Sequence, residues 1–117
     1  MTVNEFHEYQ KKAHGTSLCT RIGDTEPGCF LVYPALKLAG EAGEVAEKIG
    51  KIYRDNNGEL NRDSIHALVL EMGDVLWYLA ELATYLGVDL SQVAACNLQK
   101  LADRAARNKI QGSGDDR

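Results

Sequence analysis

A long, mainly apolar segment runs from Ile65 to Leu86, and acids interrupt it three times. A membrane span needs about 20 consecutive apolar residues, so these acids exclude one. Two of the acids, Glu71 and Asp74, are three residues apart, and residues at this spacing point to the same side of an α-helix. No Lys or Arg occurs between residues 62 and 100, so this helix has no basic side chain of its own that could pair with its acids. The segment therefore predicts a largely buried helix with two acids along one edge.

A second pair of acids, Glu41 and Glu44, has the same spacing within another apolar stretch. Three glycines, Gly40, Gly43 and Gly50, fall inside this second predicted helix. Each glycine costs roughly 1 kcal/mol relative to alanine in a helix interior. The glycines predict that another helix approaches closely along this side.

Helical periodicity over most of the chain, with no convincing strand, predicts an all-α fold. The expected helices span residues 3–14, 34–53, 64–86 and 89–108. A Thr2-x-x-Glu5 capping box opens the first helix, and Pro34 suits the first turn of the second, which ends before a turn at residues 55–58. Asp63 or Ser64 is the expected cap of the third helix, and Gly87 its terminator. An Asp89-x-x-Gln92 capping box opens the fourth helix. A chain of 117 residues fits one domain, expected over residues 1–110, with a flexible tail over 111–117.

Charge and cysteine content limit the partners and the compartment. A net charge of −4 argues against binding a nucleic acid polymer, which requires a basic surface. The N-terminus shows no secretory signal pattern. Cys19, Cys29 and Cys96 are odd in number and lack CxxC spacing, which favours free thiols and a cytoplasmic protein. A zinc site made of His14, Cys19 and Cys29 has a spacing that fits no known module.

The four acids need a compensating charge if they are buried, because a desolvated carboxylate is costly without a partner. One alternative is that they pair with cations of the second helix, namely Lys37, Lys48, Lys51 and Arg54. The other is a divalent cation held by Glu41, Glu44, Glu71 and Asp74. Carboxylate oxygens without histidine favour Mg²⁺, with Mn²⁺ as a substitute, over zinc or copper.

The two acidic motifs, Glu41-x-x-Glu44 and Glu71-x-x-Asp74, resemble the signature of the all-α nucleoside triphosphate pyrophosphohydrolases of the MazG-like superfamily. The resemblance extends over residues 30–104, including the Asn97-Leu98-Gln99-Lys100-Leu101-x-x-Arg104 segment. Gly40 stands where many members have a further Glu. This form is more similar to the dCTP-pyrophosphatase-like and phage-type branches than to the phosphoribosyl-ATP branch.

The apolar area offered by the two central helices predicts a homo-oligomer, either a dimer or a tetramer. The resemblance implies a four-helix MazG-like bundle, completed by this oligomerisation. It implies Mg²⁺-dependent hydrolysis of a nucleoside triphosphate between the α and β phosphorus atoms, in house-cleaning of the nucleotide pool. The four acids would bind the metal, and Glu44 or Glu47 would accept a proton from the attacking water. Asn97, Lys100 and Arg104 would contact the phosphates and Tyr78 the sugar or base, with Lys48 as a further candidate.

Two other interpretations remain open. Within the same enzyme class, the substrate would be phosphoribosyl-ATP. From a different class, the chain would be a non-catalytic helical assembly module that retains a structural metal site. The sequence does not determine the base, the sugar, the number of metal ions or the choice between dimer and tetramer.

Overall fold

The computed structural model describes residues 3–17 and 31–115. These residues form four helices: α1 (Val3–Gly15), α2 (Val32–Asn56), α3 (Arg62–Tyr85) and α4 (Leu90–Ala106). No strand occurs among the described residues, so the all-α prediction is confirmed. None of the four helices combines the length and the apolarity needed to cross a lipid bilayer.

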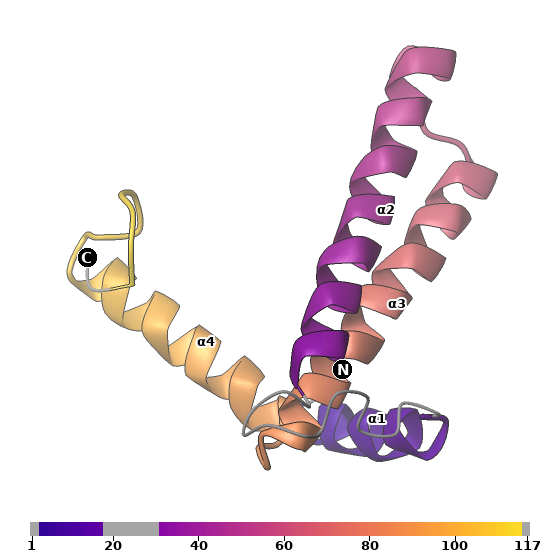
Figure 1. Cartoon of the computed structure of the whole chain (residues 1–117). Coiled ribbons are helices and arrows are strands. Elements are labelled where there is room, and N and C mark those ends of the chain that lie inside the picture. The colour runs from indigo at the N-terminus through magenta and orange to yellow at the C-terminus, as the bar shows by residue number, and fades with distance from the viewer. Residues whose placement is uncertain (1–2, 18–30, 116–117) are drawn as a thin grey trace.

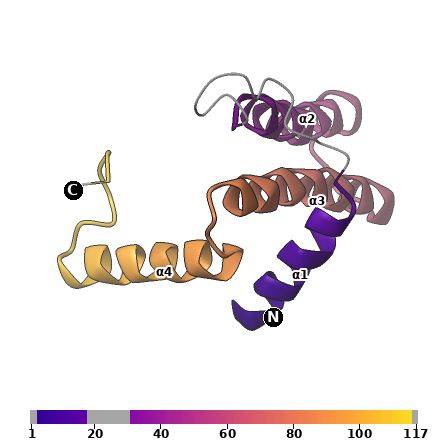
Figure 2. The ribbon, with the colours of Figure 1, turned by 60° about the horizontal axis from the view of Figure 1, so that its bottom comes forward.

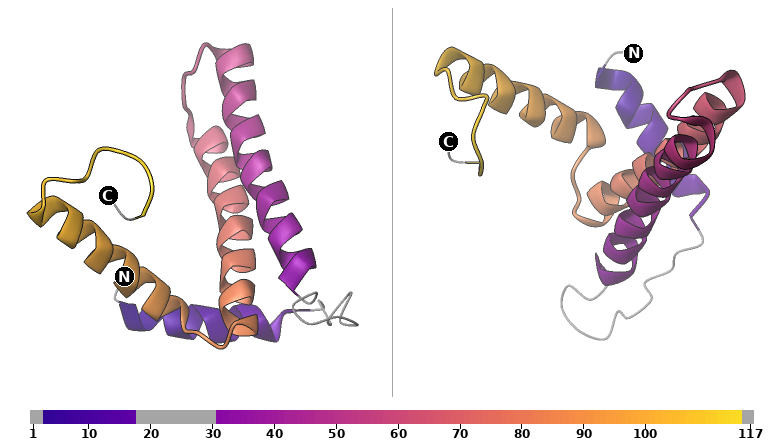
Figure 3. Two further views of the ribbon diagram at one scale, coloured as in Figure 1. Left: turned by 60° about the vertical axis from the view of Figure 1, so that its left-hand side comes forward. Right: turned by 90° about the horizontal axis from the view of Figure 1, so that it is seen from above.

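The four helices do not form one closed bundle within a single chain. α2 and α3 stand side by side as an antiparallel hairpin, and α1 lies across the end of α3 where that helix finishes (Figure 1). α4 packs against α1 and the end of α3 and then leads away from the hairpin (Figures 2 and 3). The molecule is therefore an open arrangement in which α3 contacts each of the other three helices.

The turn between α2 and α3 follows its sequence signals, but the cap of α3 differs from the prediction. Asn57 and Gly58 adopt positive φ angles of 52° and 78°, which ends α2 as expected. Neither Asp63 nor Ser64 is the cap of α3. Asn61 takes this role: its side chain accepts from the backbone N–H of Ser64, whose hydroxyl accepts in return from the backbone of Asn61 at 2.9 Å. This reciprocal pair of hydrogen bonds satisfies two backbone N–H groups at once, which favours a start of α3 at Arg62 over the later start that was expected.

The junction between α3 and α4 also differs in part from its prediction. Gly87 has a φ of 71° and terminates α3 as expected. Asp89 precedes α4, but its side chain makes no capping hydrogen bond, and its carboxylate Oδ1 lies 2.8 Å from Nδ1 of His7 on α1. The start of α4 is capped from α1 instead, because Oε1 of Gln10 accepts from the backbone N–H of Leu90 at 2.7 Å. Thr2, expected to cap α1, lies outside the described residues.

The buried core is small and sits where α1, α3 and α4 meet. Ala13, Ala80 and Leu90 are buried there, and half-buried aromatic residues of α1 and α3 pack around them. Gln10 is buried among them and donates to the carbonyl of Val88 at 2.9 Å. This polar contact joins α1 to the turn before α4, so the three helices are held together by hydrogen bonds as well as by apolar contact.

The hairpin of α2 and α3 leaves apolar side chains uncovered. Its large exposed residues include Leu36, Ile49, Val69, Leu70 and Met72. A Cβ atom built at the glycines of α2 would meet no heavy atom within 4 Å. The close helix approach predicted from these glycines is therefore not made within one described chain. Contiguous exposed apolar surface of this kind is typical of a face that contacts another molecule.

Of the three cysteines, Cys96 lies on α4 as an exposed free thiol, in agreement with the sequence prediction. Cys19 and Cys29 lie outside the described residues.

Candidate functional site

Three of the four predicted metal ligands converge on the hairpin. Glu41 and Glu44 from α2 and Glu71 from α3 each place a carboxylate oxygen within 4.8 Å of the oxygens of the other two. The three-residue spacing brings the α2 pair to one side of its helix, and the antiparallel packing of α3 brings Glu71 opposite. Carboxylates at this separation repel one another unless a cation lies close by.

The fourth predicted ligand, Asp74, lies beside this cluster rather than within it. Asp74 and Glu41 line a pocket of about 380 Å³, together with Thr16, Trp77 and Tyr78. A volume of this size is within the usual range for small-molecule pockets, roughly 300–1,000 Å³. The acids thus border a hollow large enough for part of a nucleotide-sized ligand.

Lysines from α2 contact two of the acids. Nζ of Lys37 lies 3.4 Å from Oε1 of Glu41, and Nζ of Lys48 lies 3.2 Å from Oε1 of Glu71. The cation next to Glu71 therefore comes from α2, as in the alternative in which the acids pair with cations of the second helix. The hydrogen bond to Glu41 raises the pKa of Lys37, with the charges of Tyr78 and Glu41 adding to it. These lysines supply the charge compensation in the metal-free arrangement.

The two candidates for the general base lie in different surroundings. Glu44 belongs to the converging cluster. Glu47 is exposed, and its Oε1 lies 2.8 Å from Nζ of Lys51. The hydrogen bond from Lys51, followed by the charge of that lysine, lowers the pKa of Glu47. A carboxylate with a lowered pKa is a weaker proton acceptor, so the contact with Lys51 makes Glu47 a poorer general base.

Two aromatic residues, Trp77 and Tyr78, form part of the wall of the acid-lined pocket. The rings of Trp77 and Tyr78 meet edge to face with centroids 4.8 Å apart, and Nζ of Lys37 lies 5.7 Å from the Tyr78 centroid. Tyr78 thus borders the pocket, as its spacing from Asp74 predicts. Tyr9 of α1 also lies near: burial raises its pKa, and the charge of Asp74 raises it further.

Thr16, which the sequence did not indicate, also lines this pocket from the end of α1. Thr16 directly follows α1, and its hydroxyl accepts a hydrogen bond from Nε1 of Trp77 at 3.0 Å. Nothing in the local pattern around Thr16 indicates this contact, because it depends on how α1 crosses α3. The crossing becomes visible only in the folded arrangement (Figure 2).

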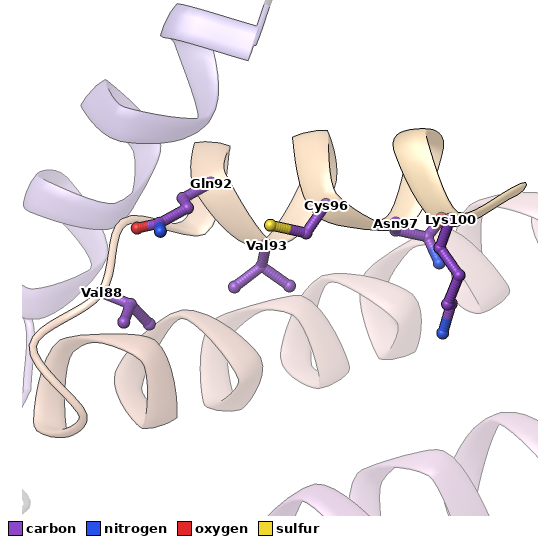
Figure 4. Close-up of a pocket in the computed structure, with 6 residues that line it drawn as sticks. All are labelled: Val88, Gln92, Val93, Cys96, Asn97 and Lys100. Carbon is purple, nitrogen blue, oxygen red and sulfur yellow. The ribbon is translucent and has the colours of Figure 1, made fainter. Parts of the chain in front are cut away.

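The structure does not bring the predicted phosphate-binding residues of α4 to the acids within one chain. Asn97 and Lys100 line a separate hollow along α4 (Figure 4). Arg104 is buried, and Nη2 of Arg104 and Nζ of Lys100 lie 2.9 Å and 3.1 Å from Oδ1 of Asp115. These two cations therefore hold residue 115 against α4, while the mobility expected for the tail stays a prediction.

The donor set fits a hard divalent cation. The clustered ligand atoms are all carboxylate oxygens, which Mg²⁺ and Mn²⁺ prefer, and the described residues place no thiol or imidazole among them. Partial exposure of Glu41 and Glu71 leaves room for water or substrate oxygens, which Mg²⁺ typically keeps in its coordination sphere.

Sequence comparisons with known proteins identify relatives of this chain. The family described as "MazG nucleotide pyrophosphohydrolase domain" matches residues 34–107, which include all four acids and α4. The "Gene 37 protein" of Mycobacterium phage L5 is 45% identical over 109 residues, covering 93% of this chain and 96% of the phage protein. No solved structure matches the chain. The family description implies a nucleotide as substrate and pyrophosphate-bond hydrolysis as the reaction. The chain belongs to the family of MazG nucleotide pyrophosphohydrolase domains.

Proposed function

We propose that this protein hydrolyses a nucleoside triphosphate between the α and β phosphorus atoms, giving a nucleoside monophosphate and pyrophosphate, with Mg²⁺ as cofactor. The observation that carries the proposal is the convergence of Glu41, Glu44 and Glu71 from two helices, beside a pocket that contains Asp74. The matched family supports the reaction class. The same chemistry suits the removal of unwanted nucleotides from the cytoplasmic pool.

The four carboxylates would hold the metal on the hairpin. When bound, Mg²⁺ supplies positive charge against the phosphate oxygens and lowers the pKa of a water molecule. The acids come from two long helices packed side by side, so their positions are fixed by helix geometry rather than by a loop. Such fixed placement lowers the cost of reaching the transition state, because the charges need no rearrangement.

Glu44 is the proton acceptor that the surroundings favour. It belongs to the acidic cluster, whereas the contact with Lys51 already engages Glu47. In this proposal Glu44 takes the proton from the attacking water, and Glu47 keeps Lys51 in place on the outer surface of α2.

Lys48 and Tyr78 are proposed to contact the substrate. The ammonium group of Lys48, which lies 3.2 Å from Oε1 of Glu71, would be available to a phosphate oxygen if a metal compensated Glu71 instead. Tyr78 borders the acid-lined pocket, where an aromatic ring offers its face or edge to a sugar or base.

We further propose a homo-oligomer, because one chain leaves both its apolar surface and its site incomplete. A groove of about 740 Å³ on the hairpin is lined by apolar residues, among them Val45, Val69, Met72 and Leu79. Since α4 leads away from the hairpin, a phosphate contact from Asn97, Lys100 or Arg104 requires the α4 of a second copy. A dimer or tetramer would meet both needs.

A non-catalytic assembly module is the second candidate function. The ion pairs of Lys37 and Lys48 favour it, because they compensate two of the acids without a metal. Such a module would bury the apolar groove and have no need for the pocket beside Asp74.

The experiment is a panel of nucleoside triphosphates that includes modified bases, deoxyribose forms and phosphoribosyl-ATP. Each is incubated with the protein and Mg²⁺, and pyrophosphate release is measured. We expect release from at least one nucleoside triphosphate, which excess chelator abolishes. Release from phosphoribosyl-ATP alone would assign the sibling activity. Silence across the panel would favour the assembly module.

A further inference from the structure

The tail after α4 places a carboxylate between two cations of that helix. Oδ1 of Asp115 lies 2.9 Å from Nη2 of Arg104 and 3.1 Å from Nζ of Lys100. Nη2 of Arg104 also donates to the backbone carbonyl of Asp115 at 3.0 Å. The hydrogen bonds from Lys100 and then Arg104 lower the pKa of Asp115, so its carboxylate is charged at neutral pH. The tail thus supplies these two cations with an anion from the same chain.

The backbone after α4 turns back along that helix (Figure 1). Asn108 takes a positive φ of 57°, and the N–H of Lys109 donates to the carbonyl of Arg104 at 2.7 Å. Gly114 has a φ of 82°, a conformation that residues with a Cβ atom rarely adopt. The position of Asp115 therefore depends on the backbone at Gly114 as well as on the two ion pairs.

Arg104 is a buried cation whose donors are only partly used. Its side chain is 5% exposed, although the end of α4 lies away from the other three helices (Figure 1). The tail and α4 itself therefore supply its cover. Nε of Arg104 is buried with no hydrogen-bond partner among the described residues. A buried charged donor without a partner is costly, so an anion with more acceptor atoms would be favoured here.

A phosphate group offers such acceptors. It presents three oxygens, and a guanidinium binds it through two parallel hydrogen bonds. Lys100 adds a second cation and also lines the hollow of about 430 Å³ along α4, which leaves space for the rest of a ligand (Figure 4). Residues 100–110 carry four basic side chains and one acidic one, in a chain of net charge −4. This end of α4 therefore attracts anions.

We propose that Asp115 is an internal competitor of phosphate: the tail blocks an anion site made by Lys100 and Arg104 until a phosphate group displaces it. The side chain of Asp115 is 80% exposed, and an ion pair with so exposed a partner contributes little stability, which permits displacement. The link to turnover rests on the proposed function, in which α4 of a second copy contacts the phosphates of the nucleoside triphosphate. The tail then lowers the affinity for substrate and leaves the metal ligands on α2 and α3 untouched.

Pyrophosphate binding tests the site without an assay of turnover. The full chain is titrated with pyrophosphate by isothermal titration calorimetry in excess chelator, so that no divalent cation takes part. We expect Asp115→Asn to bind pyrophosphate about fivefold more tightly than the wild type, the upper end of the effect of an exposed ion pair. Adding Lys100→Gln to Asp115→Asn should remove this gain. Equal affinity of Asp115→Asn and the wild type, or no binding by either, would overturn the proposal.

Asp103→Asn is the control for net charge. Asp103 lies on the same end of α4, but its Oδ2 contacts Nη2 of Arg107 at 2.8 Å. This variant removes the same charge as Asp115→Asn and leaves the tail in place. Its pyrophosphate affinity should rise less than about twofold. A gain equal to that of Asp115→Asn would show that charge alone is responsible and would refute the competition.

Gly114→Val releases the tail without changing any charge. A β-branched residue is strongly disfavoured at a φ of 82°, so the backbone can no longer hold Asp115 against α4. Pyrophosphate affinity should rise in this variant as it does in Asp115→Asn. Ser113→Val is the control, because the φ of Ser113 is not positive, and its affinity should equal that of the wild type. An unchanged affinity in Gly114→Val would overturn the role of the tail.

Steady-state kinetics test the link to the nucleotide. We expect Asp115→Asn to lower KM for the nucleoside triphosphate about fivefold with kcat unchanged, because the tail contacts none of the proposed metal ligands. An unchanged KM would refute the link. If the proposed function fails, neither protein turns over a nucleotide, while the gain in pyrophosphate affinity remains. If only the competition fails, turnover is present and Asp115→Asn changes neither pyrophosphate affinity nor KM.

Discussion

Lys48 on α2 contacts Glu71 on α3, with Nζ 3.2 Å from Oε1, at a carboxylate that also belongs to the acidic cluster. A lysine next to this carboxylate reduces the negative charge that Glu71 offers to a divalent cation. In the proposed function we therefore expect Lys48 to weaken metal binding in the free protein and to contact a phosphate oxygen of the bound substrate.

Replacing Lys48 by Met separates these two roles. We expect Lys48→Met to bind Mn²⁺ more tightly without nucleotide, because Glu71 loses its competing cation, and to show a higher KM for nucleoside triphosphate. Isothermal titration and steady-state kinetics measure the two effects. Lys51→Met is the control, since Lys51 contacts the exposed Glu47 outside the cluster. A Lys48→Met protein with unchanged metal affinity would show that the ion pair does not compete.

Of the three acids in the cluster, Glu44 is the one that contacts no lysine among the described residues. Glu44→Gln removes repulsion with Glu41 and Glu71, so without metal it should raise the free energy of unfolding by about 0.5 kcal/mol, the size of close like-charge repulsion on a helix. Saturating Mg²⁺ should stabilise the wild type more than the variant. Thermal unfolding with and without Mg²⁺ measures both. A variant that gains as much stability from Mg²⁺ as the wild type would remove Glu44 from the metal site.

The pKa of Tyr9 reports the charge at Asp74. Burial and then the negative charge of Asp74 raise the pKa of Tyr9, because both disfavour tyrosinate. Asp74→Asn removes the second cause, so the Tyr9 pKa should fall while staying above its usual value. A divalent cation bound at Asp74 should lower it in the wild type for the same reason. Tyrosine-selective ¹³C NMR titration measures both shifts, and a Tyr9 pKa that ignores Mg²⁺ would argue against a metal next to Asp74.

The exposed apolar face of the hairpin predicts self-association. Met72 is 58% exposed and lines the apolar groove, so Met72→Glu should place a charge in the interface and release monomers. Leu60→Glu is the control, because Leu60 is 60% exposed in the turn between α2 and α3. Sedimentation velocity distinguishes the outcomes. A wild-type chain that stays monomeric at micromolar concentration would refute the proposed oligomer.

Features set by local spacing could be predicted from the sequence. The helices follow from apolar periodicity, and the placement of Glu41 with Glu44 on one helix side follows from three-residue spacing. Gly87 terminates α3 because its φ of 71° suits glycine. These outcomes depend on residues within a few positions of each other, which is why the pattern alone determines them.

Features set by the contact of distant segments could not be predicted. The pairing of Lys48 with Glu71 depends on the register between α2 and α3, and the role of Thr16 depends on how α1 crosses α3. Gln10 accepts a hydrogen bond from the backbone N–H of Leu90, 80 positions away, and no local pattern around Asp89 indicates this contact. The direction of α4 likewise follows from its packing on α1, which no periodicity in α4 itself encodes.

The most direct measurement is Mn²⁺ binding followed by electron paramagnetic resonance, with and without a nonhydrolysable triphosphate analogue. It compares the wild type with a variant that carries Gln at 41, 44 and 71 and Asn at 74. We expect that the wild type binds Mn²⁺, that the analogue tightens this binding, and that the variant loses both effects. Equal Mn²⁺ affinity in the two proteins would contradict the proposed metal site.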